Sequence, residues 1–562
     1  MIVYGDPQFT ATTAEMLARV CEPTHPGSEL DVRRVCLIAA GQLEQGIADE
    51  WPDSDLTVAA QCVTDACAAH FLDEFWNENG RIDTPVASAV SALESKLGAR
   101  RTSLLSIKVP EGFAFYTLFP EQYGIAALDW LKAHTTVADK QAIVVGVRSI
   151  GTTLSAIVAQ TLLRHGWDVQ RLTARPAGHP YERQAALNVS GDAAFALVVD
   201  EGPGRSGSSM ASVAEALAER GVRRICFLPG HTNGPGPEAS ETVRARWETT
   251  RQVHVPVKQV RWNGHTLIET LASVTEQQLN SPVRTIHDVS AGEWREFAFG
   301  NEHEWPPVSA AFERSKYLMT LNDRRRALWK FTGFTAALHH AISREPIQLV
   351  PSLCACHGFT MQPWIEGERL RAGHADDELL EKLADYIASA AQPAASRDAR
   401  LASARRLGEM LFWNAKELLG EDTAKECHAF TESAISFTDS HAPPCYGDGR
   451  MAPHEFIRTA NGEIFKSDAG GHDSDHTMVG QQSVLWDVAG TTIEWRFKDL
   501  VRGHFCEAMG RHVLFNEDVL RFYCAAYAAF RAGLFAMSGN SSATRDYAEA
   551  LRSQLVCDVD FK

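Results

Sequence analysis

The sequence has no CxxC pair, no secretory leader at its start and no apolar run near the ~20 residues that a membrane-spanning helix needs. Its 12 cysteines are scattered, which is typical of reduced thiols rather than of a disulfide framework. Positive charge is also scarce, with 54 Lys and Arg against 71 Asp and Glu. These absences predict a cytoplasmic protein with no membrane span and no nucleic-acid surface, which would need a basic patch.

With 562 residues, the chain is long enough for two or three domains. We expect a multidomain fold of mixed α/β and α+β class. Its predicted parts are N-terminal helices over 1–104, a parallel-sheet domain over 105–240, a connector over 241–282 and a further domain over 283–562. Apolar residues at helical spacing predict the first part. A loop dense in glycine and proline, 229–240, marks the predicted end of the second.

The most informative stretch is ALVVDEGPGRSGSS at 196–209. An apolar strand runs into Asp200 and Glu201, and a turn then leads into a predicted helix. The turn contains Ser206, Gly207, Ser208 and Ser209. Ligands of open parallel sheets bind where the strands end, and N–H groups at a helix N-terminus bind phosphate. The stretch therefore predicts a site for a phosphorylated sugar.

This stretch resembles the ribose-phosphate motif of type I phosphoribosyltransferases, although Gly207 comes one residue later than in the usual motif. The resemblance implies that Asp200 and Glu201 face the ribose of phosphoribosyl pyrophosphate, with Mg²⁺ at the pyrophosphate, and that 206–209 hold the 5-phosphate. A second strand-to-helix turn resembles the family's pyrophosphate loop, and its residues include Arg148, Ser149 and Gly151. An arginine fork suits a diphosphate. The plain alternative is that both acids only solvate a strand end.

The second half of the chain carries a lysine on a strand and then two acid-bearing loops. Lys330 lies in an apolar strand predicted over 324–334, and 357–370 predicts a strand that ends in a polar turn. Asp448 follows in YGDGRMAPHEF, and Asp468 follows in IFKSDAGGH. Phosphoryl transfer depends on positioning and charge neutralisation, which a lysine and carboxylates supply.

This order of parts resembles the aminoglycoside phosphotransferase branch of the two-lobed protein-kinase-like fold. The resemblance implies that Lys330 contacts the phosphates of ATP and that 359–364 form the hinge at the adenine. It also implies that Asp448 is the catalytic acid and that Asp468 binds Mg²⁺. His454, or the adjacent glutamate, stands in for the family's asparagine at the metal.

Because no glycine-rich loop precedes Lys330, the sequence leaves an active kinase and a nucleotide- or partner-binding pseudokinase both open. Two metal-like groupings also have plain alternatives. One is either a ligand set beside Asp468 or a polar surface loop, and consists of His472, Asp473, Asp475 and His476. The other is either a zinc fragment or a set of strand neighbours, and consists of Cys354, Cys356 and His357.

Together these motifs predict an enzyme that uses phosphoribosyl pyrophosphate to ribosylate a small nitrogenous acceptor. The second domain is expected to phosphorylate a small-molecule hydroxyl with ATP, and two activities on one chain suggest consecutive steps on a nucleotide-like metabolite. One alternative is a phosphoribosyltransferase with a regulatory pseudokinase. Another is a non-enzymatic sensor of phosphoribosyl pyrophosphate. The sequence names neither the acceptors nor the oligomeric state, for which a homodimer is one option.

Overall fold

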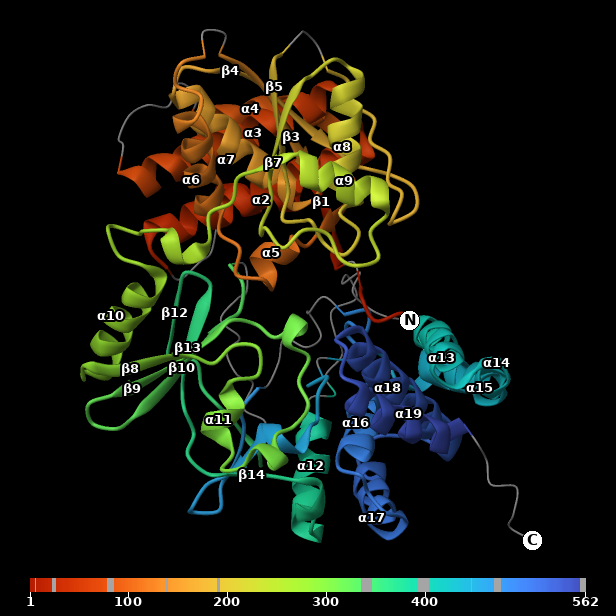
Figure 1. Cartoon of the computed structure of the whole chain (residues 1–562). Coiled ribbons are helices and arrows are strands. Elements are labelled where there is room, and N and C mark those ends of the chain that lie inside the picture. Colours follow the sequence, from red (N-terminus) through yellow and green to blue (C-terminus); the bar gives the residue numbers. More distant parts are fainter. Residues whose placement is uncertain are drawn as a thin grey trace.

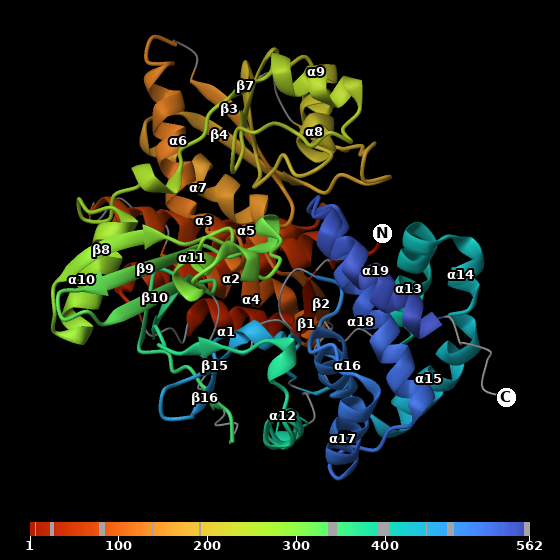
Figure 2. The ribbon, with the colours of Figure 1, turned by 60° about the horizontal axis from the view of Figure 1, so that its bottom comes forward.

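Two bodies, one above the other in Figure 1, make up the structure, which is a computed structural model. Elements before about residue 260 form the upper body, and most later elements form the lower one (Figures 1 and 2). The residues described are 1–5, 7–22, 27–77, 85–137, 140–189, 193–334, 346–389, 391, 404–445, 447–468 and 477–555.

Helices precede the main sheet of the upper body, as the apolar spacing predicts. They are α1 (Thr13–Cys21), α2 (Glu29–Glu50), α3 (Asp55–Trp76) and α4 (Val86–Leu97). A two-stranded antiparallel ribbon flanks them, made of β1 (Gln8–Thr12) and β2 (Leu104–Lys108). The start of α2 has a capping box, because Ser28 Oγ accepts from the N–H of Asp31 and the Asp31 carboxylate accepts from the N–H of Ser28. The first helices lie against α3 and the later helix α7, which buries α2 along most of its length.

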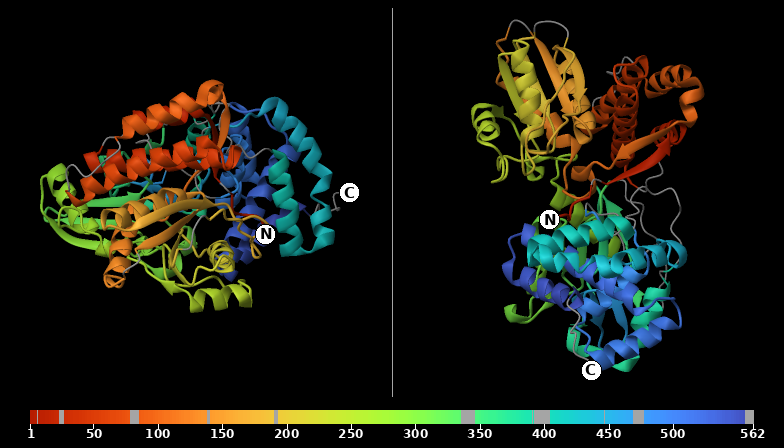
Figure 3. Two further views of the ribbon diagram at one scale, coloured as in Figure 1. Left: turned by 90° about the horizontal axis from the view of Figure 1, so that it is seen from above. Right: turned by 90° about the vertical axis from the view of Figure 1, so that its right-hand side faces the viewer.

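The main sheet of the upper body is parallel and has the order β4-β3-β5-β6-β7. Its strands are β3 (Gln141–Val147), β4 (Asp168–Ala174), β5 (Phe195–Val199), β6 (Arg224–Leu228) and β7 (Arg251–Gln252). Helices α6 (Pro120–Lys132) and α7 (Ile150–Arg164) cover one face, and α8 (Ser208–Glu219) and α9 (Glu241–Thr249) cover the other. Figure 3 shows this layering from the side. The sheet continues past residue 240, since β7 pairs with β6.

A second, antiparallel sheet has the order β12-β13-β10-β9-β8. Its strands are β8 (Val283–Asp288), β9 (Lys316–Leu321), β10 (Arg326–Phe331), β12 (Cys354–Cys356) and β13 (Phe359–Pro363). Helix α10 (Leu267–Leu279) lies on this sheet, and its Thr275 Oγ1 accepts a 2.8 Å hydrogen bond from Trp329 Nε1. Side chains of this sheet belong to the same apolar core as the upper body. The second sheet is therefore built onto the upper body rather than joined by a free connector.

Helices with a small sheet complete the lower body. The sheet has the order β11-β16-β15-β14, with β11 (Gln348–Leu349), β14 (Glu368–Arg369), β15 (Phe456–Arg458) and β16 (Ile464–Lys466). The helices are α12 (Asp377–Ser389), α13 (Ala404–Leu419), α14 (Glu421–Lys425), α15 (His428–His441), α16 (Leu485–Glu494), α17 (Asp499–Gly510), α18 (Glu517–Met537) and α19 (Ser541–Leu555). Helix α18 contacts α13, α15, α16 and α19, and nearly all of its residues are buried. Among the helices in the described ranges, none is both long and apolar enough to cross a membrane.

The first residues of the chain belong to the lower body, where Figure 1 shows the N-terminus beside α13. The Ile2 N–H donates to Asn414 Oδ1 at 2.6 Å, and Asn414 Nδ2 donates back to the Ile2 carbonyl at 3.0 Å. The Val3 side chain is buried, and its carbonyl accepts from the N–H of Met478. The chain therefore starts in the lower body and crosses to the upper one before α1.

Candidate functional site

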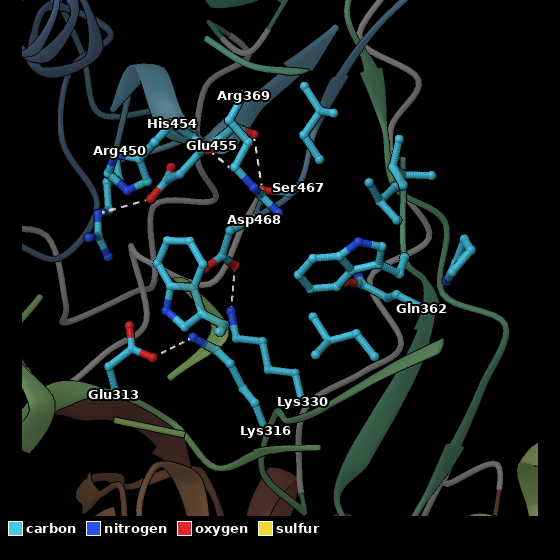
Figure 4. A pocket seen from close by; sticks show the side chains of 17 residues that line it. Glu313, Lys316, Lys330, Gln362, Arg369, Arg450, His454, Glu455, Ser467 and Asp468 are labelled. Carbon is cyan, nitrogen blue, oxygen red and sulfur yellow. Dashed lines mark hydrogen bonds and ion pairs between the residues drawn. The ribbon is translucent and has the colours of Figure 1, made fainter. Parts of the chain in front are cut away.

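A pocket lies between the antiparallel sheet and the small sheet (Figure 4). It contains about 720 Å³ of free space, part of which is open solvent. Its apolar and aromatic lining includes Leu328, Val350, Pro363, Trp364, Ile365 and Ile457. Its charged lining comprises Lys316, Lys330, Arg369, Arg450, Glu313, Glu455 and Asp468. A pocket that is apolar on one part and cationic on another suits a ligand with a flat base and an anionic tail.

Lys330 and Asp468, which the sequence placed at the phosphates and at the metal, meet in this pocket. Lys330 lies on β10, Asp468 follows β16, and their side chains form an ion pair (Figure 4). Burial lowers the pKa of Lys330, and the charge of Asp468 offsets part of that effect. The antiparallel strand that carries Lys330 thus faces the loop that follows β16.

The predicted hinge lies along the same pocket. Strand β13 contributes Gln362 and Pro363, and Trp364 and Ile365 continue the wall. Backbone pairing of β13 with β10 fixes this wall beside the lysine strand, because Lys330 stands opposite Thr360. The wall therefore belongs to the same sheet as Lys330, as the predicted hinge requires.

Arg369 is a pocket residue that the sequence reasoning missed. Its guanidinium donates to the His454 carbonyl at 3.0 Å and to Ser467 Oγ at 3.3 Å. It also lies 5.6 Å from the ring centroid of Trp294 and 5.5 Å from that of Trp364. Burial lowers the pKa of Arg369 to about 10. The only sequence signal is an arginine two residues past a glycine turn, which is too common to single out.

The structure places Asp448 outside this pocket. Its carboxylate accepts from the Tyr386 hydroxyl at 2.5 Å and pairs with Lys466 Nζ at 3.1 Å, and only 1 % of the residue is exposed. Asp487 on α16 accepts from the N–H groups of Asp448 and Gly449 at 2.7 and 2.8 Å. These bonds fix the loop so that Arg450, two residues later, lines the pocket. Asp448, which the resemblance implies is the catalytic acid, therefore does not line this pocket, whereas Arg450 of the same loop does.

His454 and Glu455, the predicted replacements for an asparagine, both line the pocket. The His454 ring stacks on Trp294 with centroids 6.0 Å apart, and burial together with Arg450 holds its pKa well below the usual value. Glu455 pairs with Lys466 at 2.7 Å and with Arg450 at 3.0 Å. Both residues therefore lie near Asp468, but each is already engaged by neighbouring side chains.

Several predicted metal residues lie elsewhere or outside the described ranges. The stretch 469–476 lies outside the described residues and contains His472, Asp473, Asp475 and His476. Tyr446 also lies outside the described residues. Cys354 and Cys356 are neighbours on β12, and His357 Nδ1 lies 3.0 Å from the Asp31 carboxylate. Across the described ranges, no group of three or more His, Cys, Asp and Glu side chains is arranged to hold a metal ion.

Asp200 and Glu201 form a second candidate site at the carboxyl end of β5, where the sequence placed the sugar. Glu201 Oε2 accepts from the N–H of Gly112 at 2.6 Å, and the Tyr123 hydroxyl donates to the Asp200 carbonyl at 2.8 Å. Burial raises the pKa of Glu201 to about 7 and raises that of Asp200 well above its ordinary value. Two adjacent acids are thus held where protonation is favoured.

The serine turn follows directly and leads into α8. Gly207 has a left-handed conformation with φ of 64° and precedes the first helical residue, and its carbonyl accepts from Trp247 Nε1 at 2.9 Å. Ser206 Oγ lies 3.0 Å from Ser208 Oγ, which donates to the Pro180 carbonyl. At the start of α8 the Ser208 N–H donates to Ser206 Oγ at 3.4 Å. The turn can present its remaining N–H groups to an anion.

The predicted pyrophosphate turn reaches the same sheet edge only in part. Gly151 lies so close to β5 that a Cβ there would be 2.6 Å from the Val199 carbonyl oxygen. Ser149 precedes α7. The Arg148 guanidinium, however, bonds Asp49 of α2 and Thr173 Oγ1, each at 3.0 Å. The acids, the serine turn and Gly151 therefore converge, while Arg148 is paired with a helix of the N-terminal part.

No family model matches this chain, and no curated protein matches it. Among solved structures, a choline kinase from Streptococcus pneumoniae resembles 51 % of this chain over 99 % of its own, at a TM-score of 0.34 and 11 % identity. A macrolide 2'-phosphotransferase from Brachybacterium faecium matches 50 % of this chain over 97 % of its own, at a TM-score of 0.33 and 9 % identity. A GDP complex of aminoglycoside 2'-phosphotransferase-IIIa matches 51 % of this chain over 97 % of its own, at a TM-score of 0.34 and 12 % identity. None of the three is a phosphoribosyltransferase, and at these TM-scores the likeness decides nothing about activity.

Proposed function

We propose that this chain is a kinase-like protein that binds a nucleoside triphosphate in the pocket of Figure 4. The observation that carries the proposal is the Lys330–Asp468 ion pair inside a pocket with an apolar wall and a cationic one. The base would lie along 362–365, and the phosphates would lie among the lysines and Arg369. Charge-assisted hydrogen bonds to phosphate oxygens are the strong contacts of such a complex.

Small-molecule phosphorylation is the reaction class that such a pocket serves when an acceptor hydroxyl can approach the terminal phosphate. Asp448 cannot take the acceptor's proton in this arrangement, because Tyr386 and Lys466 occupy its carboxylate. Glu455 is paired with Lys466 and Arg450. The geometry therefore favours nucleotide binding over phosphoryl transfer, which leaves the regulatory pseudokinase as our preferred form of this domain.

A second function is proposed for the carboxyl edge of the parallel sheet, which is binding of phosphoribosyl pyrophosphate and ribosyl transfer to a nitrogenous acceptor. The observation in its favour is the pair Asp200 and Glu201 beside the serine turn at the start of α8. The two acids would face the ribose hydroxyls, and 206–209 would bind the 5-phosphate. Magnesium would arrive with the pyrophosphate, whose charge Arg148 could meet only after leaving Asp49.

Two binding titrations test these functions separately. Lys330→Met is expected to weaken ATP binding by about tenfold or more, because it removes a charge-assisted contact, and to leave phosphoribosyl pyrophosphate binding unchanged. Lys132→Met removes a lysine that is 76 % exposed and serves as the matched control. Glu201→Gln is expected to weaken phosphoribosyl pyrophosphate binding and to leave ATP binding unchanged. Full ATP affinity in the Lys330 variant would contradict the first function. The second function would be contradicted if the wild-type protein released no pyrophosphate from phosphoribosyl pyrophosphate with any acceptor.

A further inference from the structure

Among the residues that the structure describes, each carboxylate that lines the nucleotide pocket has a cation beside it. Glu313 pairs with Lys316 at 2.6 Å, and Asp468 pairs with Lys330 (Figure 4). Glu455 lies between two cations, Lys466 at 2.7 Å and Arg450 at 3.0 Å. The pocket therefore balances its own acids before any ligand enters.

A divalent cation fits poorly among these residues. Mg²⁺ prefers near-octahedral oxygen ligands and binds through one or two carboxylates that are free to face it. Asp468 and Glu455 are the carboxylates at the predicted metal position, and both face ammonium or guanidinium groups instead. Arg450 lines the same pocket as Asp468 and pairs with Glu455 at 3.0 Å. A metal at Asp468 would have to share its site with that positive charge.

We propose that the pocket binds its nucleoside polyphosphate without a divalent cation, and that Arg450 supplies the charge neutralisation that a metal would otherwise supply. This inference rests on the nucleotide-binding function proposed above. Arg450 lines the pocket directly after Asp448 and Gly449, whose N–H groups are bonded to Asp487 of α16. A guanidinium can contact two phosphate oxygens at once and so neutralise part of a polyphosphate's charge.

The same geometry explains how the ligand enters. Arg450 pairs with Glu455, and Lys330 pairs with Asp468. When Arg450 turns toward a ligand, Glu455 still has Lys466 as a partner. Arg369 keeps its bonds to the His454 carbonyl and to Ser467 while its charge faces the pocket. A polyphosphate can therefore replace Glu455 as the partner of Arg450 without leaving a buried acid unpaired.

The test is a calorimetric titration of the full chain with ATP, once in excess EDTA and once in Mg²⁺. The wild type is expected to bind with affinities that differ by no more than about threefold between the two conditions. Arg450→Met is expected to lose about tenfold or more in EDTA and to recover part of the loss in Mg²⁺, because one charge-assisted contact is gone. Arg458→Met removes an arginine of β15 that does not line the pocket and is the matched control.

Each outcome separates this inference from the function on which it rests. Binding that appears only in Mg²⁺ overturns the inference and leaves nucleotide binding standing. Absence of ATP binding in both conditions overturns the nucleotide function itself. Unchanged affinity of Arg450→Met in EDTA removes Arg450 from the inference. If that variant does not fold, as judged by circular dichroism, Arg450→Lys retains the charge without the fork and is expected to fall between the wild type and a loss of about tenfold.

Discussion

Asp448→Asn distinguishes a carboxylate that supports the fold from one that serves a reaction. The substitution keeps the side-chain size and removes the charge that pairs with Lys466 at 3.1 Å, where 0 % of either side chain is exposed. The new carboxamide can still accept the hydrogen bond from Tyr386. The backbone bonds to Asp487 are untouched. The change therefore removes the ion pair with Lys466 together with the 3.3 Å hydrogen bond that Asp448 Oδ1 accepts from the Arg450 N–H.

The expected cost follows from the contacts that remain. Removing one partner of a buried ion pair costs about 3–5 kcal/mol when the other charge is left without a partner. Lys466 keeps Glu455 at 2.7 Å and the Asp468 carbonyl at 2.9 Å, so we expect a loss of about 2 kcal/mol in the free energy of unfolding. Nucleotide affinity is expected to stay within about twofold, because Asp448 does not line the pocket.

Urea unfolding followed by tryptophan fluorescence measures this loss, since Trp486 and Trp495 are buried in the lower body. Asp422→Asn removes the same charge from an exposed pair with Lys425 and is expected to leave the free energy of unfolding nearly unchanged. The reasoning is refuted if Asp448→Asn unfolds like the wild type yet abolishes ATP-dependent phosphorylation of a small molecule. Asp448 would then be the catalytic acid that the sequence resemblance implies.

Two further predictions concern the sheet-edge site. Gly112→Ala would put a Cβ 2.6 Å from Glu201 Oε2 and 2.8 Å from Ile150 Cδ1, so it is expected to lower the melting temperature and weaken phosphoribosyl pyrophosphate binding. Gly300→Ala is its control, because a Cβ there would meet nothing within 4 Å. Equal effects of the two substitutions would contradict the contact between residue 112 and Glu201. Burial raises the pKa of Glu201 from 4.5 to about 7, so its contribution to stability is present below pH 4.5 and lost as the pH rises to about 7. Melting temperatures across that range should fall less in Glu201→Gln, and an identical slope would refute the shift.

Local sequence pattern was enough to predict the strands and helices that carry both sites. The apolar runs that end at Val147 and Val199 form buried parallel strands, and their register brings the following turns to one edge. For the second site it was the family resemblance that implied roles for Lys330 and Asp468 at one nucleotide, and these two side chains form an ion pair. These predictions succeed because burial on both faces of a parallel sheet demands continuous apolar runs.

Position within the second loop could not be predicted in the same way. The letters of Tyr-Gly-Asp favour Asp448, but the residue that faces the pocket depends on which N–H groups bond Asp487, which lies far along the chain on α16. Arg369 was missed because β14 has only two residues and is defined by pairing with β15. The short strand β7 escaped notice for the same reason, since two residues carry no periodic signal.

The predicted connector over 241–282 does not separate the two sites, because one segment contacts both. The N–H of Gly112, at the start of α5 (Glu111–Ala114), donates to Glu201, and the Thr117 hydroxyl donates to Ser315 at 2.8 Å. Ser315 directly precedes Lys316, whose side chain lines the nucleotide pocket. Phe334, just past the strand of Lys330, packs edge-on against Phe113 and Phe119 of the same segment. The candidate sites therefore share the segment 111–119, which contacts Glu201 on one side and residues beside the Lys330 strand on the other.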